Sequence, residues 1–309
     1  MELNENRPSR VKKSVINSSS DRWFHILNYA ILTLFTLIVL YPLVFVVSCS
    51  LSSAYAVISN KVWLWPVNFS MDSYKAIIRH PLLLSGYGNA MLYTVFGTAV
   101  SVVLLLTAAY PLSRKNLPGR GFFTVYFLLT MFFNGGTIPN YILVLQMRLK
   151  DSRLALIIPF MFSAYTMIIV RTYFSTTIPP ELNDSAQIDG CTDIRFFFRI
   201  ALPLSGPVIA VVTLMHAVGN WNGFYRALLY LNTASKFPLQ LVLRDILFIS
   251  QMPMDVLSRI DDSKLTELTN AMELLKYSVI VVAAVPVMIL YPFIQRYFVK
   301  GMMIGSVKG

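Results

Sequence analysis

The strongest constraint on this chain comes from six apolar stretches, each long enough to cross a lipid bilayer as a helix. A helix needs about 20 mostly apolar residues to span the hydrocarbon core of a membrane. Of the 309 residues, 56% are hydrophobic and only 13% are charged, whereas soluble domains carry about 25% charged residues. The sequence therefore predicts an all-α integral membrane protein with six transmembrane helices. The expected spans are 26–50, 90–112, a stretch beginning near 122, 154–174, 208–231 and 277–298.

Positive charge near the N-terminus predicts how the spans are oriented. The first 25 residues are polar and include Arg7, Arg10, Lys12 and Lys13, as is typical of a cytoplasmic segment. The first apolar run starts too late and is too long for a cleaved signal peptide. Because six spans return the chain to its starting side, we expect both termini to be cytoplasmic. The expected division is a cytoplasmic arm, 1–25, and a membrane domain, 26–309, with a cytoplasmic loop at 179–207.

The net charge of +11 would favour nucleic-acid binding in a soluble protein. In a membrane protein, Lys and Arg flank the spans and contact anionic lipid. We therefore expect membrane lipid, and no nucleic acid, among the partners.

No motif for catalysis or metal binding occurs in the sequence. The two cysteines, Cys49 and Cys191, give no disulfide framework and no metal-ligand spacing. The three histidines lie in unrelated contexts, and neither Gly-x-Ser-x-Gly nor His-Glu-x-x-His is present. The phosphate-binding pattern Gly-x-x-x-x-Gly-Lys-Ser/Thr is also missing. We therefore expect no catalytic residue, no metal site and no ATP site of that kind in this chain.

One polar stretch, 179–207, lies between the fourth and fifth spans and has the pattern of a helix, a turn and a second helix. Pro179 and Pro180 suit the start of a helix, where the missing proline N–H has no partner to lose. Glu181 and Asp184 would place negative charge in the first turn, where the helix dipole favours it. Asp189-Gly190 is then expected to end the helix.

Apolar residues on both short helices predict the sides by which this stretch docks. They are Leu182, Ala186 and Ile188 on the first helix and Ile194, Phe197, Phe198 and Ile200 on the second. Pro203 and Pro207 interrupt the second helix before the fifth span. An ordinary amphipathic hairpin on the membrane surface is the simpler interpretation of the same pattern.

The same stretch resembles the EAA loop of bacterial ABC-importer permeases. In that family, Glu-Ala-Ala, Asp-Gly-Ala, a Phe, an Ile, Leu-Pro and a later Pro follow one another at fixed spacing. The corresponding residues here are Asp184-Ser185-Ala186, Asp189-Gly190-Cys191, Phe197, Ile200, Leu202-Pro203 and Pro207. Three positions depart from the pattern, with Asp for Glu, Ser for Ala and Cys for Ala. These changes keep charge or size and leave open the details of the docking contact.

The resemblance covers essentially the whole chain and implies a type I ABC importer permease in a bacterial cell membrane. Such a subunit moves a carbohydrate, here an oligosaccharide or polysaccharide fragment, into the cell by alternating access. The implied partners are a second homologous permease in a heterodimer, two ATP-binding cassette ATPase subunits and an extracellular solute-binding protein. ATP and Mg²⁺ would bind the ATPases, with no cofactor in this chain. The implied ATPase-coupling residues are Glu181, Asp184, Ser185, Ala186, Asp189, Gly190, Phe197 and Pro203.

Two clusters inside the spans are candidates for the substrate path. Residues 132–139 of the third span contain Gly-Gly and Pro, which break a helix, and unwound backbone in a membrane is tolerated against protein or a wet cavity. A packing kink explains that break equally well. The fifth span ends in an aromatic and amide cluster that suits a sugar, although an interfacial aromatic belt would look the same. The candidate substrate-path residues are Asn134, Tyr141, Asn220, Trp221, Asn222 and Tyr225.

The remaining segments carry weaker predictions. Residues 51–88 and 233–276 are expected to be external, with a short helix just before the second span and an amphipathic helix carrying Leu265, Leu268, Met272 and Leu275. The tail 300–309 resembles that of the small permease subunit of the maltose importer. Two alternatives to an importer subunit are a secondary transporter and a polytopic membrane enzyme. Both need membrane-embedded functional groups, and Arg171 is the main candidate charge near a span end.

Overall fold

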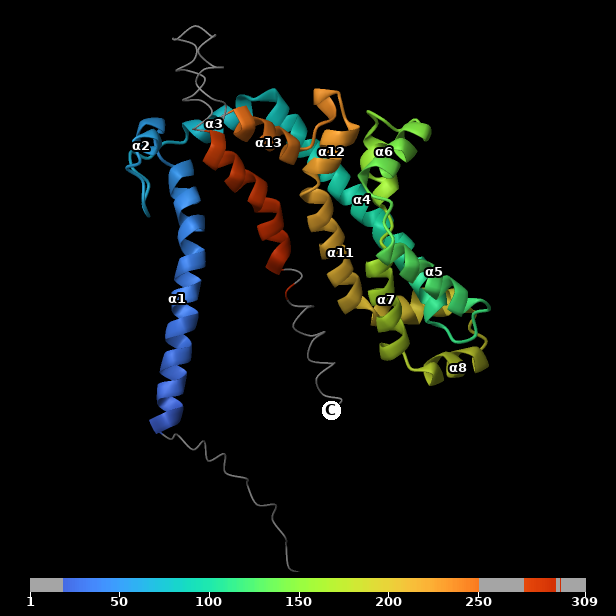
Figure 1. The fold of residues 1–309 in the computed structure, drawn as a ribbon. Coiled ribbons are helices and arrows are strands. Elements are labelled where there is room, and N and C mark those ends of the chain that lie inside the picture. The colour runs from blue at the N-terminus through green and yellow to red at the C-terminus, as the bar shows by residue number, and fades with distance from the viewer. Residues whose placement is uncertain (1–18, 250–274, 293–294, 296–309) are drawn as a thin grey trace, which may run out of the picture.

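Helices and turns make up the part of the chain that the computed structural model describes, residues 19–249, 275–292 and 295, with no strand in those ranges (Figure 1). Three helices are continuous, and long and apolar enough to cross a membrane. They are α1 (Ser19–Ser50), α4 (Pro81–Ser113) and the helix Leu275–Pro292. The prediction of an all-α chain is confirmed for these residues.

Further spans are present only as pairs of short helices that meet at a bend. Helices α5 (Arg120–Phe132) and α6 (Thr137–Gln146) are bent by 113°. The segment Arg153–Phe160, which comprises η1 (Arg153–Leu156) and η2 (Ile158–Phe160), meets α7 (Ala164–Thr177) at 49°. The segment Asp193–Leu204 meets α11 (Gly206–Trp221) at 79°. Length and composition thus allow three to six spans, and the count of six stays a prediction.

The bend between α5 and α6 lies where the sequence predicted a broken helix. Helix α5 ends at Phe132, and α6 begins at Thr137. Between them, the Asn134 side-chain oxygen accepts a hydrogen bond from the Gly136 N–H at 2.9 Å. Gly136 has a φ of 82°, a backbone conformation that glycine adopts readily and side-chain-bearing residues avoid. The local sequence therefore determines this break.

Two of the predicted boundaries are wrong, and tertiary packing explains the first. Helix α4 begins at Pro81, well before the expected start at residue 90, so residues 81–88 are helical rather than part of an irregular external segment. Pro81 occupies the first helical position, and Leu83 is buried in a cluster with Leu239. The expected fifth span, 208–231, is two helices, because α11 ends at Trp221 and α12 (Phe224–Tyr230) follows.

The segment 233–276, expected to be an external loop, contains a helix that the sequence analysis missed. Helix α13 (Leu239–Ile249) follows the short turn η4 (Ala234–Lys236) and lies along the N-terminal half of α4. We call this the outer half of α4, and its C-terminal half the inner half. A Cβ placed on Gly86 would lie 3.3 Å from the backbone N and Cα of Leu239, so the two helices touch through their backbones. Of the residues expected to form an amphipathic helix near 265–275, only Leu275 lies within the described residues. The tail 300–309 lies outside them.

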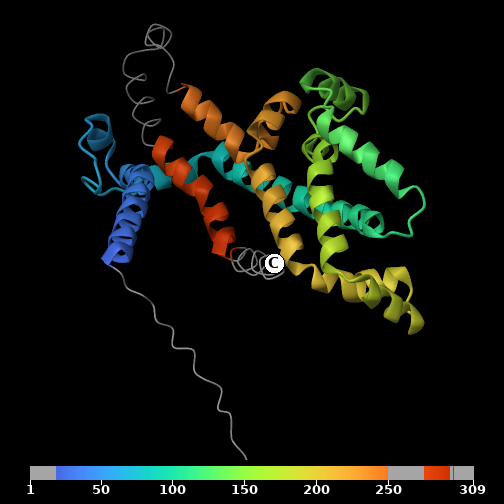
Figure 2. The ribbon, with the colours of Figure 1, turned by 60° about the horizontal axis from the view of Figure 1, so that its bottom comes forward.

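Helix α4 is the centre of the fold and packs against α7, α11 and α13. Its inner half contributes Leu105, Ala109 and Tyr110 to a buried cluster with α7 and the segment before α11. Its outer half contributes Leu83 and Ala90 to a second cluster, with α13 and the helix Leu275–Pro292. Figures 1 and 2 show α4 running from the end of the molecule that carries α12 and α13 to the end that carries α8.

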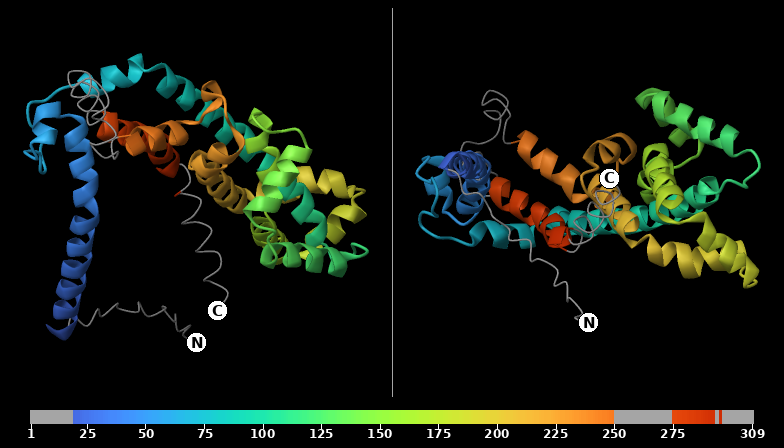
Figure 3. Two further views of the ribbon diagram at one scale, coloured as in Figure 1. Left: turned by 45° about the horizontal axis from the view of Figure 1, so that its top comes forward. Right: turned by 90° about the horizontal axis from the view of Figure 1, so that it is seen from below.

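Along most of its length, helix α1 stands apart from the other helices (Figure 3, left). Its most apolar 18-residue window contains no buried residue. The helix is attached through its last turn, where Ser48 and Ser50 are buried and hydrogen-bond to Leu64 and Tyr74. The connecting segment holds α2 (Ala54–Ile58) and α3 (Asp72–Arg79), and α3 confirms the short helix expected before the second span. The long apolar surface of α1 therefore needs cover from lipid or another chain.

Candidate functional site

Helix α8 (Pro180–Ile188) forms the first half of the loop predicted at 179–207. Pro179 precedes the helix in an extended conformation, Pro180 is its first residue and Glu181 lies in its first turn. The C-terminal end has the hydrogen bonds of a Schellman cap: the Gly190 N–H donates to Gln187 at 3.0 Å, and the Cys191 N–H donates to Ala186 at 2.8 Å. Gly190 has a φ of 75°, so this turn requires a left-handed residue. The expected start and end of the helix are confirmed.

Two details of the expected first helix are wrong. Asp184 lies beyond the first turn, because the helix begins at Pro180 and only Glu181 is acidic there. The expected apolar side is also reduced to one buried residue, Ala186, since Leu182 and Ile188 are exposed. A nine-residue helix with one buried residue leaves most of its surface open. The exposed surface includes the carboxylates of Glu181 and Asp184 and also Ser185, whose hydroxyl donates to the Glu181 carbonyl at 2.9 Å.

The second half of the loop is a short α-helix, α9 (Asp193–Phe196), that continues as a π-helical turn, η3 (Phe197–Ala201), into α10 (Leu202–Leu204). Phe196, Phe197 and Ala201 are buried, whereas Ile194 and Phe198 are 74% and 60% exposed. The expected face of Ile194, Phe197, Phe198 and Ile200 is therefore wrong. It assumed regular α-helical spacing, and a π turn changes which side chains point the same way.

Aromatic packing joins this second half to the inner end of α4. The ring of Phe197 lies 4.8 Å from that of Tyr110, and Tyr110 lies 5.7 Å from Phe174 of α7. Beyond η3, Pro203 lies in α10, and the chain bends at Ser205, whose hydroxyl donates to the Ala201 carbonyl at 2.7 Å. The interruption expected before the fifth span is thus present, and the loop is fixed to two core helices by buried rings.

A groove with a volume of about 920 Å³ lies between α8, α9 and the inner end of α4. Its walls carry Arg114 and Lys115 from the turn after α4, Arg120 at the start of α5, and the carboxylates of Asp184 and Asp193. The Arg114 guanidinium stacks over the ring of Tyr110 at 4.7 Å and donates to the Tyr110 hydroxyl at 3.1 Å. This end of the molecule therefore presents opposite charges side by side around an open cleft.

The residues predicted for the substrate path do not form one cluster. Asn134 lies exposed at the α5–α6 break, and Tyr141 is half-buried on α6, 6.0 Å from the ring of Tyr230. Asn222 and Tyr225 are exposed around the break between α11 and α12.

The other two predicted path residues make internal contacts. Asn220 donates to the Thr98 hydroxyl at 3.4 Å. Trp221 is 3% exposed, and its indole N–H donates to the Ala283 carbonyl at 3.0 Å. The ring of Trp221 also meets Tyr87 edge-on at 5.7 Å. In this conformation, Trp221 packs in the core between α4 and the helix Leu275–Pro292.

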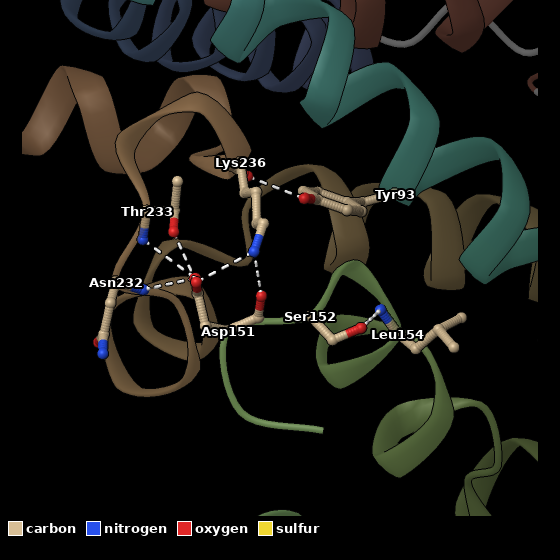
Figure 4. Close-up of polar contacts among 7 residues, drawn as sticks. All are labelled: Tyr93, Asp151, Ser152, Leu154, Asn232, Thr233 and Lys236. Carbon is tan, nitrogen blue, oxygen red and sulfur yellow. Dashed lines mark hydrogen bonds and ion pairs between the residues drawn. The ribbon is translucent and has the colours of Figure 1, made fainter. Parts of the chain in front are cut away.

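Sequence reasoning missed a polar cluster at the opposite end, centred on the carboxylate of Asp151 (Figure 4). Asp151 accepts hydrogen bonds from the N–H groups of Asn232 and Thr233 at 3.0 Å each, and from the Thr233 hydroxyl at 2.5 Å. The ammonium of Lys236 lies 3.0 Å from the same carboxylate and also contacts the Asp151 carbonyl. These bonds hold the pKa of Asp151 well below its usual range, chiefly through the Thr233 hydroxyl.

The loop that Asp151 holds is also bonded to the outer half of α4. Tyr93 donates to the Lys236 carbonyl at 2.8 Å, and Asn89 donates to the carbonyls of Ser235 and Phe237 at 2.7 and 3.1 Å. We call Asp151 and residues 232–237, together with Asn89 and Tyr93, the outer clasp. The sequence signal that could have indicated this cluster is Asp151, the one acid in the basic segment 148–153, together with Asn232-Thr233 much later in the chain.

Comparison with known proteins assigns this chain to a transporter family. Residues 13–304 match the model of a family described as the inner membrane component of binding-protein-dependent transport systems. The chain belongs to this family. It is 41% identical over 290 residues to the polygalacturonan/rhamnogalacturonan transport system permease protein YtcP of Bacillus subtilis (strain 168), covering 94% of this chain and 99% of YtcP. It is also 37% identical to protein LplC of the same organism, covering 95% and 97%.

The fold agrees with this assignment. A crystal structure of a bacterial ABC transporter that imports the acidic polysaccharide alginate contains a chain with a TM-score of 0.83 to this one. The two chains are 33% identical, and the match covers 91% of this chain and 98% of that one. The protein is therefore a non-catalytic permease subunit of an ABC importer, for which a separate ATPase hydrolyses ATP. The secondary transporter and membrane enzyme are excluded. In the described residues, no group of three His, Cys, Asp or Glu is arranged to hold a metal ion.

Proposed function

We propose that this subunit imports a carbohydrate, an oligosaccharide or a polysaccharide fragment, across a bacterial cell membrane by alternating access. The observation that carries the proposal is the match over nearly the full length to YtcP, whose name states a role in polygalacturonan and rhamnogalacturonan transport. The alginate importer that shares the fold also moves a polysaccharide. We further propose six spans with both termini in the cytoplasm, counting each bent helix pair as one span.

The loop 179–207 is proposed to couple the membrane domain to the ATPase. Its exposed acids, Glu181 and Asp184, and the neighbouring Ser185 would contact the ATPase surface. Asp189 and Gly190 form the turn that ends α8. Three further residues fix the loop to the membrane domain: Ala186 and Phe197 are buried in the cluster with α4 and α7, and Pro203 precedes the bend into α11. Closure of the ATPase dimer would therefore move the inner ends of α4 and α7 together with α8.

The proposed partners account for surfaces that this chain leaves open. A second homologous permease would share the cover of α1 with lipid, because no residue in the most apolar window of that helix is buried within the described chain. Two ATPase subunits, which bind ATP and Mg²⁺, would act at the end carrying α8, one of them on this chain. A solute-binding protein would deliver the carbohydrate at the end carrying the outer clasp. No cofactor is proposed for this chain itself.

The substrate path is proposed to run past the two helix breaks. Asn134, Tyr141, Asn222 and Tyr225 are exposed or half-buried there, where amides and ring faces can meet sugar hydroxyls and C–H surfaces. Asn220 and Trp221 are occupied by internal hydrogen bonds in this conformation. Their participation therefore requires the other conformation of the alternating-access cycle.

Purification of the tagged chain from detergent-solubilised membranes tests the proposal. We expect an ATPase and a second permease to copurify, and ATP hydrolysis to rise when the solute-binding protein loaded with oligosaccharide is added. The same protein added without sugar is the control. A chain that purifies alone, or a complex whose ATPase responds to no carbohydrate, would contradict the proposal.

A further inference from the structure

Arg226 on α12 is a positive charge in the membrane domain to which none of the preceding arguments assigns a role. It is half-buried, and its guanidinium carbon lies 3.9 Å from the centre of the Phe160 ring. Within the described residues, no carboxylate lies at ion-pair distance from Arg226, since the three ion pairs found there involve other side chains. Cations in a membrane domain face a bundle interior or a wet cavity and usually mark a substrate route.

Aromatic rings connect Arg226 to a second cation. Phe160 lies 6.1 Å from Tyr230, and Tyr230 is stacked on Tyr141 with ring centres 6.0 Å apart and an angle of 15° between the rings. The ammonium of Lys150 lies 5.5 Å from the centre of the Tyr141 ring. Three rings from α6, η2 and α12 thus form a row, with a guanidinium at one end and an ammonium at the other.

The acid that lies nearest in sequence to this row is already occupied. Asp151 follows Lys150 directly, but its carboxylate binds Asn232, Thr233 and Lys236 in the outer clasp. The positive charges of Lys150 and Arg226 are therefore not neutralised by Asp151. A guanidinium binds a carboxylate through two parallel hydrogen bonds, and such charge-assisted bonds are about twice as strong as neutral ones.

We propose that the row Lys150–Tyr141–Tyr230–Phe160–Arg226 selects sugars that carry a carboxylate, so that the substrate class is an acidic oligosaccharide built from uronate residues. This inference rests on the proposed carbohydrate import. Arg226 and Lys150 bind carboxylates of the sugar, and the row of rings between them sets the spacing of the two cations. A purely structural Arg226, held by Phe160 alone, would give no preference between acidic and neutral substrates.

The test uses the complete importer in proteoliposomes with its solute-binding protein. The two probes are trigalacturonate and its methyl ester, which has the same sugar chain with each carboxylate converted to a neutral ester. Arg226→Gln should lower uptake of the acid about 10- to 100-fold, the size expected for a hydrogen bond to a charged group. Uptake of the methyl ester should stay within about twofold, which also shows that the variant is folded. Arg226→Lys keeps the charge and should retain most of the uptake of the acid.

Arg79→Gln is the matched control, because it removes the same charge from the exposed end of α3 and should change neither uptake. If Arg226→Gln fails to assemble, Lys150→Gln replaces it, because the Lys150 side chain is exposed. Lys150→Gln should lower uptake of the acid by a smaller factor and leave uptake of the methyl ester unchanged. Equal loss of acid and ester, or no loss of either, would overturn the proposal. A wild-type importer that moves only neutral sugars would also overturn it. A wild-type importer that moves no carbohydrate would instead contradict the proposed function.

Discussion

Gly190 offers a direct test of the coupling loop, because its effect is conformational alone. It ends α8 with a φ of 75°, and a Cβ placed on it would meet no other atom within 4 Å. Substitution therefore creates no clash, and its cost comes from forcing a side-chain-bearing residue into the left-handed region. That cost is about 1–2 kcal/mol for an ordinary residue, less for Asn and more for a β-branched residue.

This conformational cost predicts the order in which variants at position 190 lose uptake and sugar-stimulated ATP hydrolysis. Because α8 contacts its own chain through only one buried residue, Ala186, little packing opposes unwinding of its last turn. A cost of 1 kcal/mol raises the unwound population about fivefold. Uptake and sugar-stimulated ATP hydrolysis should therefore fall in the order Gly, Asn, Ala, Val at position 190. Gly190→Pro should abolish both, since proline cannot reach this φ and also lacks the N–H that donates to Gln187.

The assay is sugar-stimulated ATP hydrolysis and uptake by the reconstituted importer, with the amount of inserted permease measured for every variant. Gly121→Ala is the matched control: Gly121 lies within α5, has open space around it and has no positive φ, so alanine should leave coupling unchanged. Equal activity of the Asn, Ala and Val variants at position 190 would refute the argument from backbone conformation. Normal coupled transport by Gly190→Pro would refute the assignment of this loop to coupling.

Two further predictions concern stability. Because the pKa of Asp151 is lowered in the folded protein, the ionised carboxylate stabilises the fold above about pH 4, the usual carboxyl value, and this stabilisation is lost as the pH falls further. Asp151→Asn should therefore lower the melting temperature of the purified importer at pH 7, and the difference from wild type should shrink on acidification. A difference that does not change with pH would contradict the role of the clasp. Gly86→Ala should destabilise by about 1–3 kcal/mol, the usual cost of overpacking, because its Cβ would press on the backbone of Leu239 at 3.3 Å. Gly88→Ala, with open space around it, is the control, and equal melting temperatures would contradict the close contact.

Local signals in the sequence predicted the bounds of α8 correctly. Pro179 and Pro180, followed by Asp189-Gly190, bound α8 because proline and glycine act on their own backbone angles. Such local signals could not predict which side chains of the second helical segment, α9 and η3, are buried. The passage from α9 into the π-helical turn η3 buries Phe196 and Phe197 and exposes Phe198. Nothing in the run of three phenylalanines indicates which of them will be exposed.

The outer half of the molecule was less predictable because its structure depends on distant residues. Helix α13 packs on α4 at Gly86, where the missing side chain lets the two backbones come close together. No pattern within residues 233–249 indicates that this segment will pack against Gly86. The roles predicted for Asn220 and Trp221 relied on residue type, and residue type does not reveal partners such as Thr98 and Ala283. Asp151 was passed over for the same reason, since Thr233 lies 82 positions away from it.

Helix α4 connects the two ends of the permease and gives the coupling loop a route to the outer surface. Its 33 residues span about 50 Å at 1.5 Å per residue. At the inner end, Tyr110 packs on Phe197 of the coupling loop, and at the outer end Asn89 and Tyr93 hold the loop of the clasp. Because α4 is unbroken, whereas α5–α6 and the segment before α11 are bent, we expect a displacement of α8 in the proposed mechanism to pass to the clasp as a rigid-body movement. The proposed path would then open and close at the breaks in the neighbouring helices.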